Sequence, residues 1–363
     1  MGVQPERTED LLAPEAPPDP TGGATGWERF RRVASFRNVS ALYLLAVMFV
    51  VFSFWEPHTF LTVLTWRLLL DNQAISAIVA VGVVVPLSAG VIDLALGTEV
   101  GIGAVLVARL ISDNNLSVPS AFTLTLVAGA AIGVVIAGLI VKARIGSFIV
   151  TLAMSSVLLA MIDWISRSEP ITVVATGFHT IATGELFGVV YPVYFAAGVS
   201  LLVWYVLEHT SFGRRVYATG ANPEAARLAG VRTSRVILGA TVTCGVVSAF
   251  AGVLAASQLS TGDPTITANY LLPAFAAVFL GSTQFKGGRF NVAGTLVAVA
   301  VLAIGVEGLQ LGGAPVWTPN LFNGAALLLA VGFAQLQRSP TRRTAAITRT
   351  IRSIGGSSRR EPA

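Results

Sequence analysis

The chain has 363 residues, of which 54% are hydrophobic and only 12% are charged, and its mean hydropathy is +0.73. Soluble domains carry about a quarter charged residues, so the composition excludes an ordinary soluble protein and indicates a membrane protein. The net charge of +5 is better explained by orientation in a membrane than by nucleic-acid binding, and the single cysteine, Cys244, gives no disulfide framework.

The chain begins with a proline-rich, acidic segment, "PERTEDLLAPEAPPDP". No apolar stretch occurs before Trp27, so this segment lacks the central feature of a signal peptide. Its composition favours disorder. We therefore expect residues 1–37 to form a disordered cytosolic leader.

Long apolar runs follow and define a predicted transmembrane domain over residues 38–337. A helix needs roughly 20 apolar residues to cross the hydrocarbon core, whereas barrel strands would alternate in segments of about ten. The runs predict an all-α polytopic membrane protein of about ten transmembrane helices, at residues 40–56, 69–88, 95–112, 119–140, 147–166, 190–208, 236–257, 270–284, 290–310 and 316–336.

Basic residues orient these spans. If the N-terminus lies in the cytosol, the short cytosolic loops hold nine Lys and Arg residues. The short loops on the opposite side hold three, Arg67, Arg109 and Arg167. This asymmetry fits the positive-inside rule. The blocks 69–166 and 236–336 then contain four helices each with opposite orientation, which predicts two inverted four-helix repeats.

Charged groups within the membrane are the first candidates for a transport pathway, because burying them is costly. Asp93 and Glu99 flank "LALG" between the second and third spans, where Gly97 and other glycines suggest a broken helix. The alternative for Asp93 is a cap on the third helix, with Leu94 at its first position. Further candidates near the outer ends of spans are Asp163, Glu307 and Gln310.

The segment between the sixth and seventh spans, residues 209–235, is the longest and most basic internal cytosolic segment. Gly220 ends one element, Asn222 can cap a new helix and Pro223 suits its first position. Glu224 then lies at the positive end of the helix dipole, and Gly230 can end the helix after about two turns. Isolated helices this short are marginal, so we expect docking to another protein rather than a surface linker. The apolar face would include Ala225 and Leu228.

The tail, residues 338–363, is basic and low in bulky apolar residues, and we expect it in the cytosol, where it contacts anionic lipid or nothing. No "GxxxxGK[ST]" phosphate loop occurs, so ATP hydrolysis by such a loop is not expected. His58, His179 and His209 are far apart in sequence, and we identify no catalytic set and no metal site.

Several stretches resemble the permease subunits of bacterial ABC importers for ribose, galactose and related monosaccharides. "EAARLAG", Glu224 to Gly230 with Ala226, resembles their coupling loop, and "LSAGVIDLALG" resembles their "GGIDLSVG" segment. "FAGVLAASQLSTGDPT" and "LPAFAAVFLGSTQFKGGRFNVAGTLVAV" match in the same order. Val91 and Ala95 stand where the family pattern has glycine and serine, which makes this segment less polar.

The resemblance implies a type II ABC importer-like permease in the bacterial inner (plasma) membrane, multi-pass with cytosolic N- and C-termini. It implies a cytosolic ATP-binding cassette ATPase that uses ATP and Mg, an extracytoplasmic solute-binding protein and a second permease in a homodimer or heterodimer. The chain itself would bind no cofactor and have no ATPase site. The coupling residues would be Gly220, Asn222, Pro223, Glu224, Ala225, Ala226, Leu228 and Gly230, and the segment around Asp93 would belong to the pathway.

Other functions remain open from the residues alone. Within the class, the solute could be a polyol, a signal sugar or a branched-chain amino acid. The inverted topology would also allow an ion-coupled secondary transporter, which would need no ATPase. A membrane scaffold without transport is disfavoured because it has no use for carboxyl groups in the bilayer.

Overall fold

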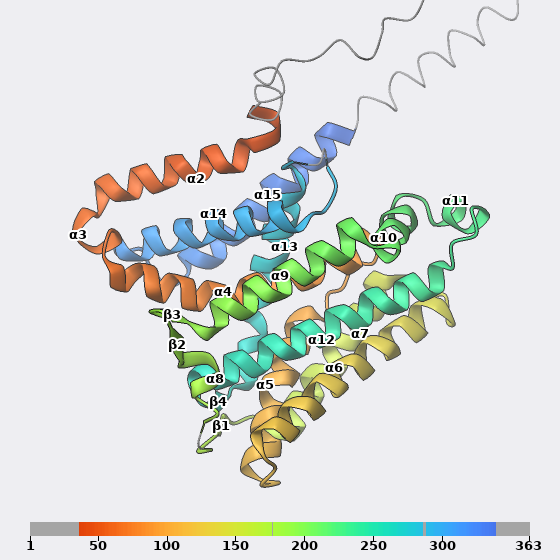
Figure 1. Ribbon diagram of the computed structural model, residues 1–363, viewed down its shortest axis with the longest axis horizontal. Coiled ribbons are helices and arrows are strands. Elements are labelled where there is room, and N and C mark those ends of the chain that lie inside the picture. The colour runs from red at the N-terminus through yellow and green to blue at the C-terminus, as the bar shows by residue number, and fades with distance from the viewer. Residues whose placement is uncertain (1–35, 176, 286–287, 339–363) are drawn as a thin grey trace, which may run out of the picture. The chain divides into compact units, whose positions relative to one another are not determined.

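The computed structural model describes residues 36–175, 177–285 and 288–338, and the long elements are helices (Figure 1). The expected leader, residues 1–37, and the expected tail, residues 338–363, therefore lie almost entirely outside the described residues. The long helices are α2 (Phe36–Trp55), α4 (Val63–Ser88), α5 (Leu96–Ser112), α6 (Val118–Val141), α7 (Ser147–Ser166), α9 (Tyr191–His209), α12 (Thr233–Leu259), α13 (Ala268–Ser282), α14 (Val292–Leu311) and α15 (Thr318–Arg338).

Each of these ten helices coincides with one of the apolar runs, with ends that differ by a few residues. Among the residues that the structure describes, seven helical segments are long and apolar enough to cross a membrane: α4, α6, α7, α9, α12, the continuous stretch Pro264–Ser282, and α14. The apolar part of α2, Ala41–Trp55, is shorter. The structure is consistent with a polytopic membrane protein.

Short elements lie at the two ends of the helices. The short helices are α3 (Pro57–Phe60), α8 (Thr180–Thr183) and the 3-10 helix η1 (Pro264–Thr267). There are also two small antiparallel strand pairs, β1 (Ile171–Thr172) with β4 (Thr261–Gly262) and β2 (Glu185–Leu186) with β3 (Val189–Val190). Figure 1 shows α10 (Ser211–Ala221) and α11 (Pro223–Leu228) at one end of α9 and α12, and the strands and α8 at the other. The end with α10 and α11 is the side predicted to face the cytosol.

The core is built around α12, which packs against α4, α5 and α6. From Ala249 to Ser257 almost every residue of α12 is buried. By contrast, α6 exposes large apolar side chains such as Leu124, Val127 and Val134. Exposed apolar faces of this kind suit contact with lipid, where they remain out of water.

The α6–α12 crossing depends on glycine. A Cβ atom on Gly129 would lie 2.4 Å from the carbonyl oxygen of Gly245, and one on Gly245 would lie 2.3 Å from that of Gly129. One turn further along α6, the hydroxyl of Thr241 donates a hydrogen bond of 2.8 Å to the carbonyl of Gly133. Glycines at positions 129, 133 and 245 thus let the two backbones touch.

This crossing gives a first prediction. Gly245→Val forces overpacking between two backbones and should lower the free energy of unfolding by about 1–3 kcal/mol. Thermal unfolding of the purified protein in detergent measures the change. Gly138→Val, on α6 where no atom lies within 4 Å of the new Cβ, is the matched control. Equal losses in the two variants would contradict this account of the crossing.

Candidate functional site

The segment after α9 forms two short helices. Thr210 begins α10 by accepting a hydrogen bond of 3.3 Å from the amide of Gly213. Asn222 begins α11, because its side-chain oxygen accepts hydrogen bonds of 3.1 Å from the amides of Glu224 and Ala225. Pro223 is the first helical residue, and Gly230, with φ of 82°, follows the end of the helix. The predicted helix and its cap are confirmed.

Most apolar side chains of α11 are exposed and do not pack on the rest of the protein. Ala226 is its one buried residue, whereas Ala225 and Ala229 are exposed and Leu228 is 91% exposed. The ion pair between Glu224 and Arg227, at 3.7 Å, is exposed on both sides. An exposed leucine on a short capped helix is suited to insertion into a groove of another protein.

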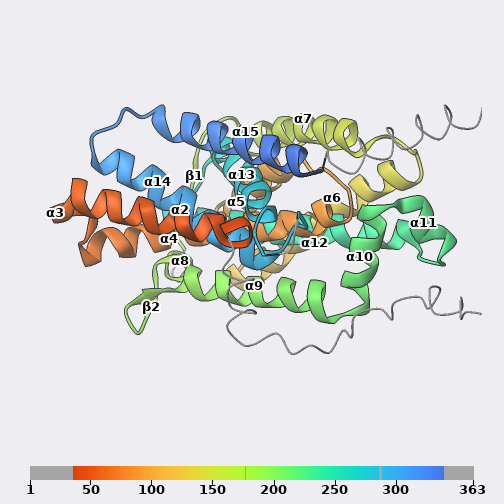
Figure 2. The same ribbon diagram turned by 90° about the horizontal axis from the view of Figure 1, so that it is seen from above.

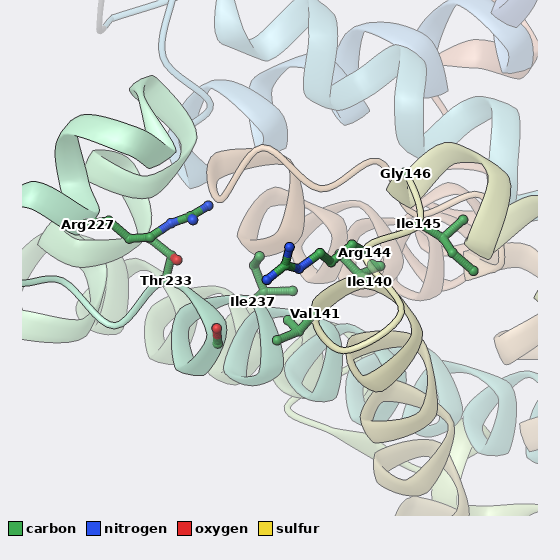
Figure 3. Close-up of a pocket in the computed structure, with 9 residues that line it drawn as sticks. Ile140, Val141, Arg144, Ile145, Gly146, Arg227, Thr233 and Ile237 are labelled. Carbon is green, nitrogen blue, oxygen red and sulfur yellow. The ribbon is translucent and has the colours of Figure 1, made fainter.

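Two cavities lined by arginine flank α11. The first, of about 500 Å³, lies between Arg227, the α6–α7 link (residues 142–146) and the start of α12 (Figure 3). Figure 3 shows the side chains of Arg144 and Arg227 near this cavity, with Ile237 between them. The second, of about 400 Å³, is lined by Arg215, Arg232 and Arg235 among others. This face therefore favours acidic groups on a partner.

α10 packs directly against the α4–α5 link, which we define as residues 89–95. A Cβ atom on Gly220 would lie 2.1 Å from the carbonyl oxygen of Ser88, and one on Gly90 would lie 3.3 Å from the Cα of Gly220. Gly90 also has φ of 80°, which favours glycine. The two backbones are therefore in contact, and no larger residue fits at Gly220 without moving one of them.

Tyr217 also fixes α10. Its hydroxyl donates a hydrogen bond of 2.9 Å to the carbonyl of Phe290, and the guanidinium of Arg289 lies 5.7 Å from its ring centre. Partial burial, followed by the negative charge of Glu208, raises the pKa of Tyr217. The hydroxyl therefore keeps its proton and remains a donor at neutral pH.

The α4–α5 link is held by side chains of the link and of α7. Asp93 Oδ1 accepts a hydrogen bond of 3.1 Å from the amide of Ala95, so Asp93 does accept an N–H group at this helix start, although α5 begins at Leu96 and not at Leu94. The amide of Ile92 donates to Ser147 Oγ at 3.3 Å, and Thr151 donates to the carbonyl of Ile92 at 3.1 Å. The link is thus attached to the start of α7 (Figure 2).

Asp93 and Glu99 lie together in the interior. Ligand-type atoms of Asp93, Glu99 and Cys244 of α12 all lie within 4.8 Å of one another, and the three residues are fully buried. Among the described residues, neither carboxyl group forms a salt bridge. Gly97, between them, touches the start of α13, because a Cβ there would lie 2.6 Å from the carbonyl of Thr267.

The other pathway candidates lie elsewhere. Asp163 is exposed on α7, Glu307 is half-buried on α14, and Gln310 is exposed near the end of α14. None of the hydrogen bonds or ion pairs among the described residues connects them to Asp93 or Glu99. The structure therefore groups Asp93, Gly97 and Glu99 and leaves the remaining three apart.

Two residues of the interior group, Cys244 and Ser248, were not among the residues predicted from the sequence. Cys244 reads as an inert member of an apolar run, yet its thiol lies beside both carboxyl groups. Ser248, fully buried one turn further along α12, lies next to Glu99. The signal was the four-residue spacing of Cys244 and Ser248, which places them on one face of α12.

Comparison with known proteins gives a family and close relatives. Residues 69–331 match the family described as "Branched-chain amino acid transport system / permease component". The ribose import permease protein RbsC of Escherichia coli K12 is 32% identical over 308 residues, which cover 84% of this chain and 95% of that protein.

Two further relatives are permeases for other sugars by name. The L-arabinose ABC transporter permease protein AraH of Azospirillum brasilense is 31% identical over 94% of this chain and 98% of its own length. The galactose/methyl galactoside import permease protein MglC of Escherichia coli K12 is 29% identical over 84% of this chain and 96% of its own. No solved structure gives a significant match.

The cap of α11 gives a second prediction. Asn222→Ala removes the acceptor of two amide hydrogen bonds and should destabilise α11 by about 1 kcal/mol, or about fivefold in its opening equilibrium. Hydrogen exchange of the α11 amides should accelerate accordingly. Asn222→Asp, which keeps an acceptor at the same position, should leave exchange slow. If exchange is unchanged in the alanine variant, the helix does not depend on this cap.

Proposed function

Because the chain belongs to the family described as the permease component of the branched-chain amino acid transport system, we propose that it is the transmembrane permease subunit of an ATP-driven importer for a monosaccharide. The observation that carries this proposal is the match to sugar import permeases over almost their whole lengths. The chain itself is a transport component and not an enzyme, and ATP and Mg would be bound by the partner ATPase.

The proposed arrangement in the bacterial inner membrane has ten spans, cytosolic termini and two inverted repeats, α4–α7 and α12–α15. The helix contacts support it, because a contact recurs when α4, α5, α6 and α7 are exchanged with α12, α13, α14 and α15 respectively. Thus α12 packs on α5, and α4 packs on α13. Likewise α5 packs on α7 as α13 packs on α15, and α6 packs on α12 as α14 packs on α4.

The links between the first two helices of each repeat also correspond. Asp93 accepts from the amide of Ala95 just before α5. Asp263 accepts from the amide of Thr265 at 2.8 Å at the start of η1, which leads into α13. An aspartate therefore receives the amide two residues further on in both links, although the surrounding sequences share little. This local correspondence supports a duplicated unit.

In this proposal α11 docks on the cytosolic ATPase. The apolar anchor would be Leu228, and the arginines around the two cavities would face acidic groups of the ATPase. Closure of the ATPase pair on ATP would pull α11 and α10, and α10 contacts the α4–α5 link through Gly220. The ATPase would thereby favour one permease conformation over the other.

The solute would pass beside the first turns of α5. Asp93, Gly97 and Glu99 are fully buried in this conformation, so a pathway that uses them opens only when the link moves. Asp163, Glu307 and Gln310 would contact the solute, if at all, at the outer end of the path. A second permease and an extracytoplasmic solute-binding protein complete the proposed importer.

The proposal is tested by reconstitution. The permease in liposomes, with its ATPase and binding protein, should take up at least one of ribose, arabinose and galactose only when ATP is present on the cytosolic side. Uptake of leucine in place of all three sugars would contradict the monosaccharide assignment. Uptake at full rate without the ATPase would instead identify an ion-coupled secondary transporter.

Leu228 gives a sharper prediction about docking. Leu228→Asp places a charge where the side chain is 91% exposed, so the permease should fold normally. It should lose most ATPase binding, because about 1.5–3 kcal/mol of apolar burial is removed and a charge is introduced. Pull-down of the ATPase and ATP-driven uptake measure the loss. Leu228→Met should retain both activities, and normal binding by Leu228→Asp would exclude Leu228 as the anchor.

A further inference from the structure

The interior group formed by Asp93, Glu99, Cys244 and Ser248 joins three elements. Asp93 belongs to the α4–α5 link, Glu99 to the first turns of α5, and Cys244 and Ser248 to α12. All four residues have an exposed fraction of 0%. Asp93 Oδ2, both carboxyl oxygens of Glu99 and Ser248 Oγ have no hydrogen-bond partner in the structure. Buried polar atoms are nearly always paired, so four unpaired atoms in one place require an explanation.

Within the part of the chain that the structure describes, no cation forms an ion pair with either carboxyl group. α6 and α13, which pack on α5, contain no charged residue. α7 contributes only Asp163, which is exposed. The charged residues of α4, Arg67 and Asp71, lie in its first third, whereas the link follows its last residue. In α12 the one charged residue is Arg235, at the exposed start.

Two ionised carboxylates in this position would be unfavourable for two reasons. Each would be removed from water without a counter-charge, and each would repel the other at short range. Carboxyl groups that share such a site hold a proton between them. A single proton reduces the charge of the pair from −2 to −1 and supplies a hydrogen-bond donor.

We propose that Glu99 is a neutral carboxylic acid whose proton is donated to Asp93, and that this shared proton fastens α5 to the α4–α5 link. The proton is assigned to Glu99 because Asp93 already accepts the amide of Ala95, which stabilises its ionised form. No backbone amide donates to Glu99, and the side chain beside it is the uncharged hydroxyl of Ser248. Ionised Asp93 also lies just ahead of the N-terminus of α5, where the helix dipole favours negative charge.

With this one proton, the unpaired polar atoms of the interior group can all form hydrogen bonds. The Glu99 hydroxyl donates to Asp93 Oδ2, and the Ser248 hydroxyl donates to the second oxygen of Glu99. Small rotations suffice, since the ligand-type atoms of Asp93, Glu99 and Cys244 lie within 4.8 Å of one another and Ser248 lies next to Glu99. Every unpaired atom of the group then has a partner, and α5 is bonded both to the link and to α12.

A bound metal ion is the competing explanation. Two carboxylates and a thiol are a possible ligand set for a divalent ion, and such an ion would require both carboxyl groups to be ionised. The two explanations differ in whether Glu99 carries a proton, which infrared spectroscopy detects directly. They also differ in whether glutamine can replace Glu99, because an amide can donate to Asp93 and accept from Ser248 as a protonated acid does.

The test compares the full-length permease with Glu99→Gln, Glu99→Ala and, as the matched control, Glu185→Gln on exposed β2. The wild type should show the carbonyl stretch of a protonated carboxylic acid at a pH where exposed glutamates are ionised. The band should disappear in Glu99→Gln and persist in Glu185→Gln. Thermal unfolding should occur near the wild-type temperature in Glu99→Gln and several degrees lower in Glu99→Ala.

Two measurements on the wild type keep the test independent of how the variants fold. Isotopic labelling of glutamate carboxyl carbons should shift the band, and metal analysis of the purified protein should find no stoichiometric divalent ion. Absence of the band, a band that does not shift with the label, or one bound metal ion per chain would overturn the proposal. So would equal destabilisation by Glu99→Gln and Glu99→Ala.

Discussion

The contact between the backbone of α10 and the carbonyl of Ser88 is the constraint on which the rest of the structure depends. Gly220 leaves no space between the two segments, so a displacement of α10 either moves the α4–α5 link or breaks the packing. The link in turn is bonded to the start of α7 through Ser147 and Thr151. A force applied at α11 therefore has a continuous, closely packed route to the interior of the membrane domain.

The interior that this route reaches is polar, and the membrane around it is not. The outer faces of α6 and α7 expose apolar side chains, which lipid can cover, while Asp93 and Glu99 are withdrawn from both lipid and water. Carboxyl groups in such a place are costly, and a chain that only had to span the bilayer would have no reason to keep them. Their position at the break between α4 and α5 places them where a moving link would expose them.

The sequence predicted the helices and the cap of α11 because these depend on local features. Apolar runs and an asparagine before a proline act over a few residues, whereas the orientation inferred from the arginines stays a prediction. Sequence reasoning could not find the Gly220–Ser88 contact, which joins residues more than a hundred positions apart, nor the approach of Cys244 and Ser248 to Glu99. Asp163 on α7, and Glu307 and Gln310 on α14, stay predictions for the pathway. Ten spans and an inverted repeat remain proposals that the paired helix contacts support.

The most direct measurement is hydrogen exchange of the amides of residues 89–95 in the permease assembled with its ATPase, with and without ATP. If α10 transmits the motion of α11, exchange in the link should change with nucleotide together with exchange in residues 223–228. A response confined to residues 223–228, with exchange in the link unchanged, would contradict the account.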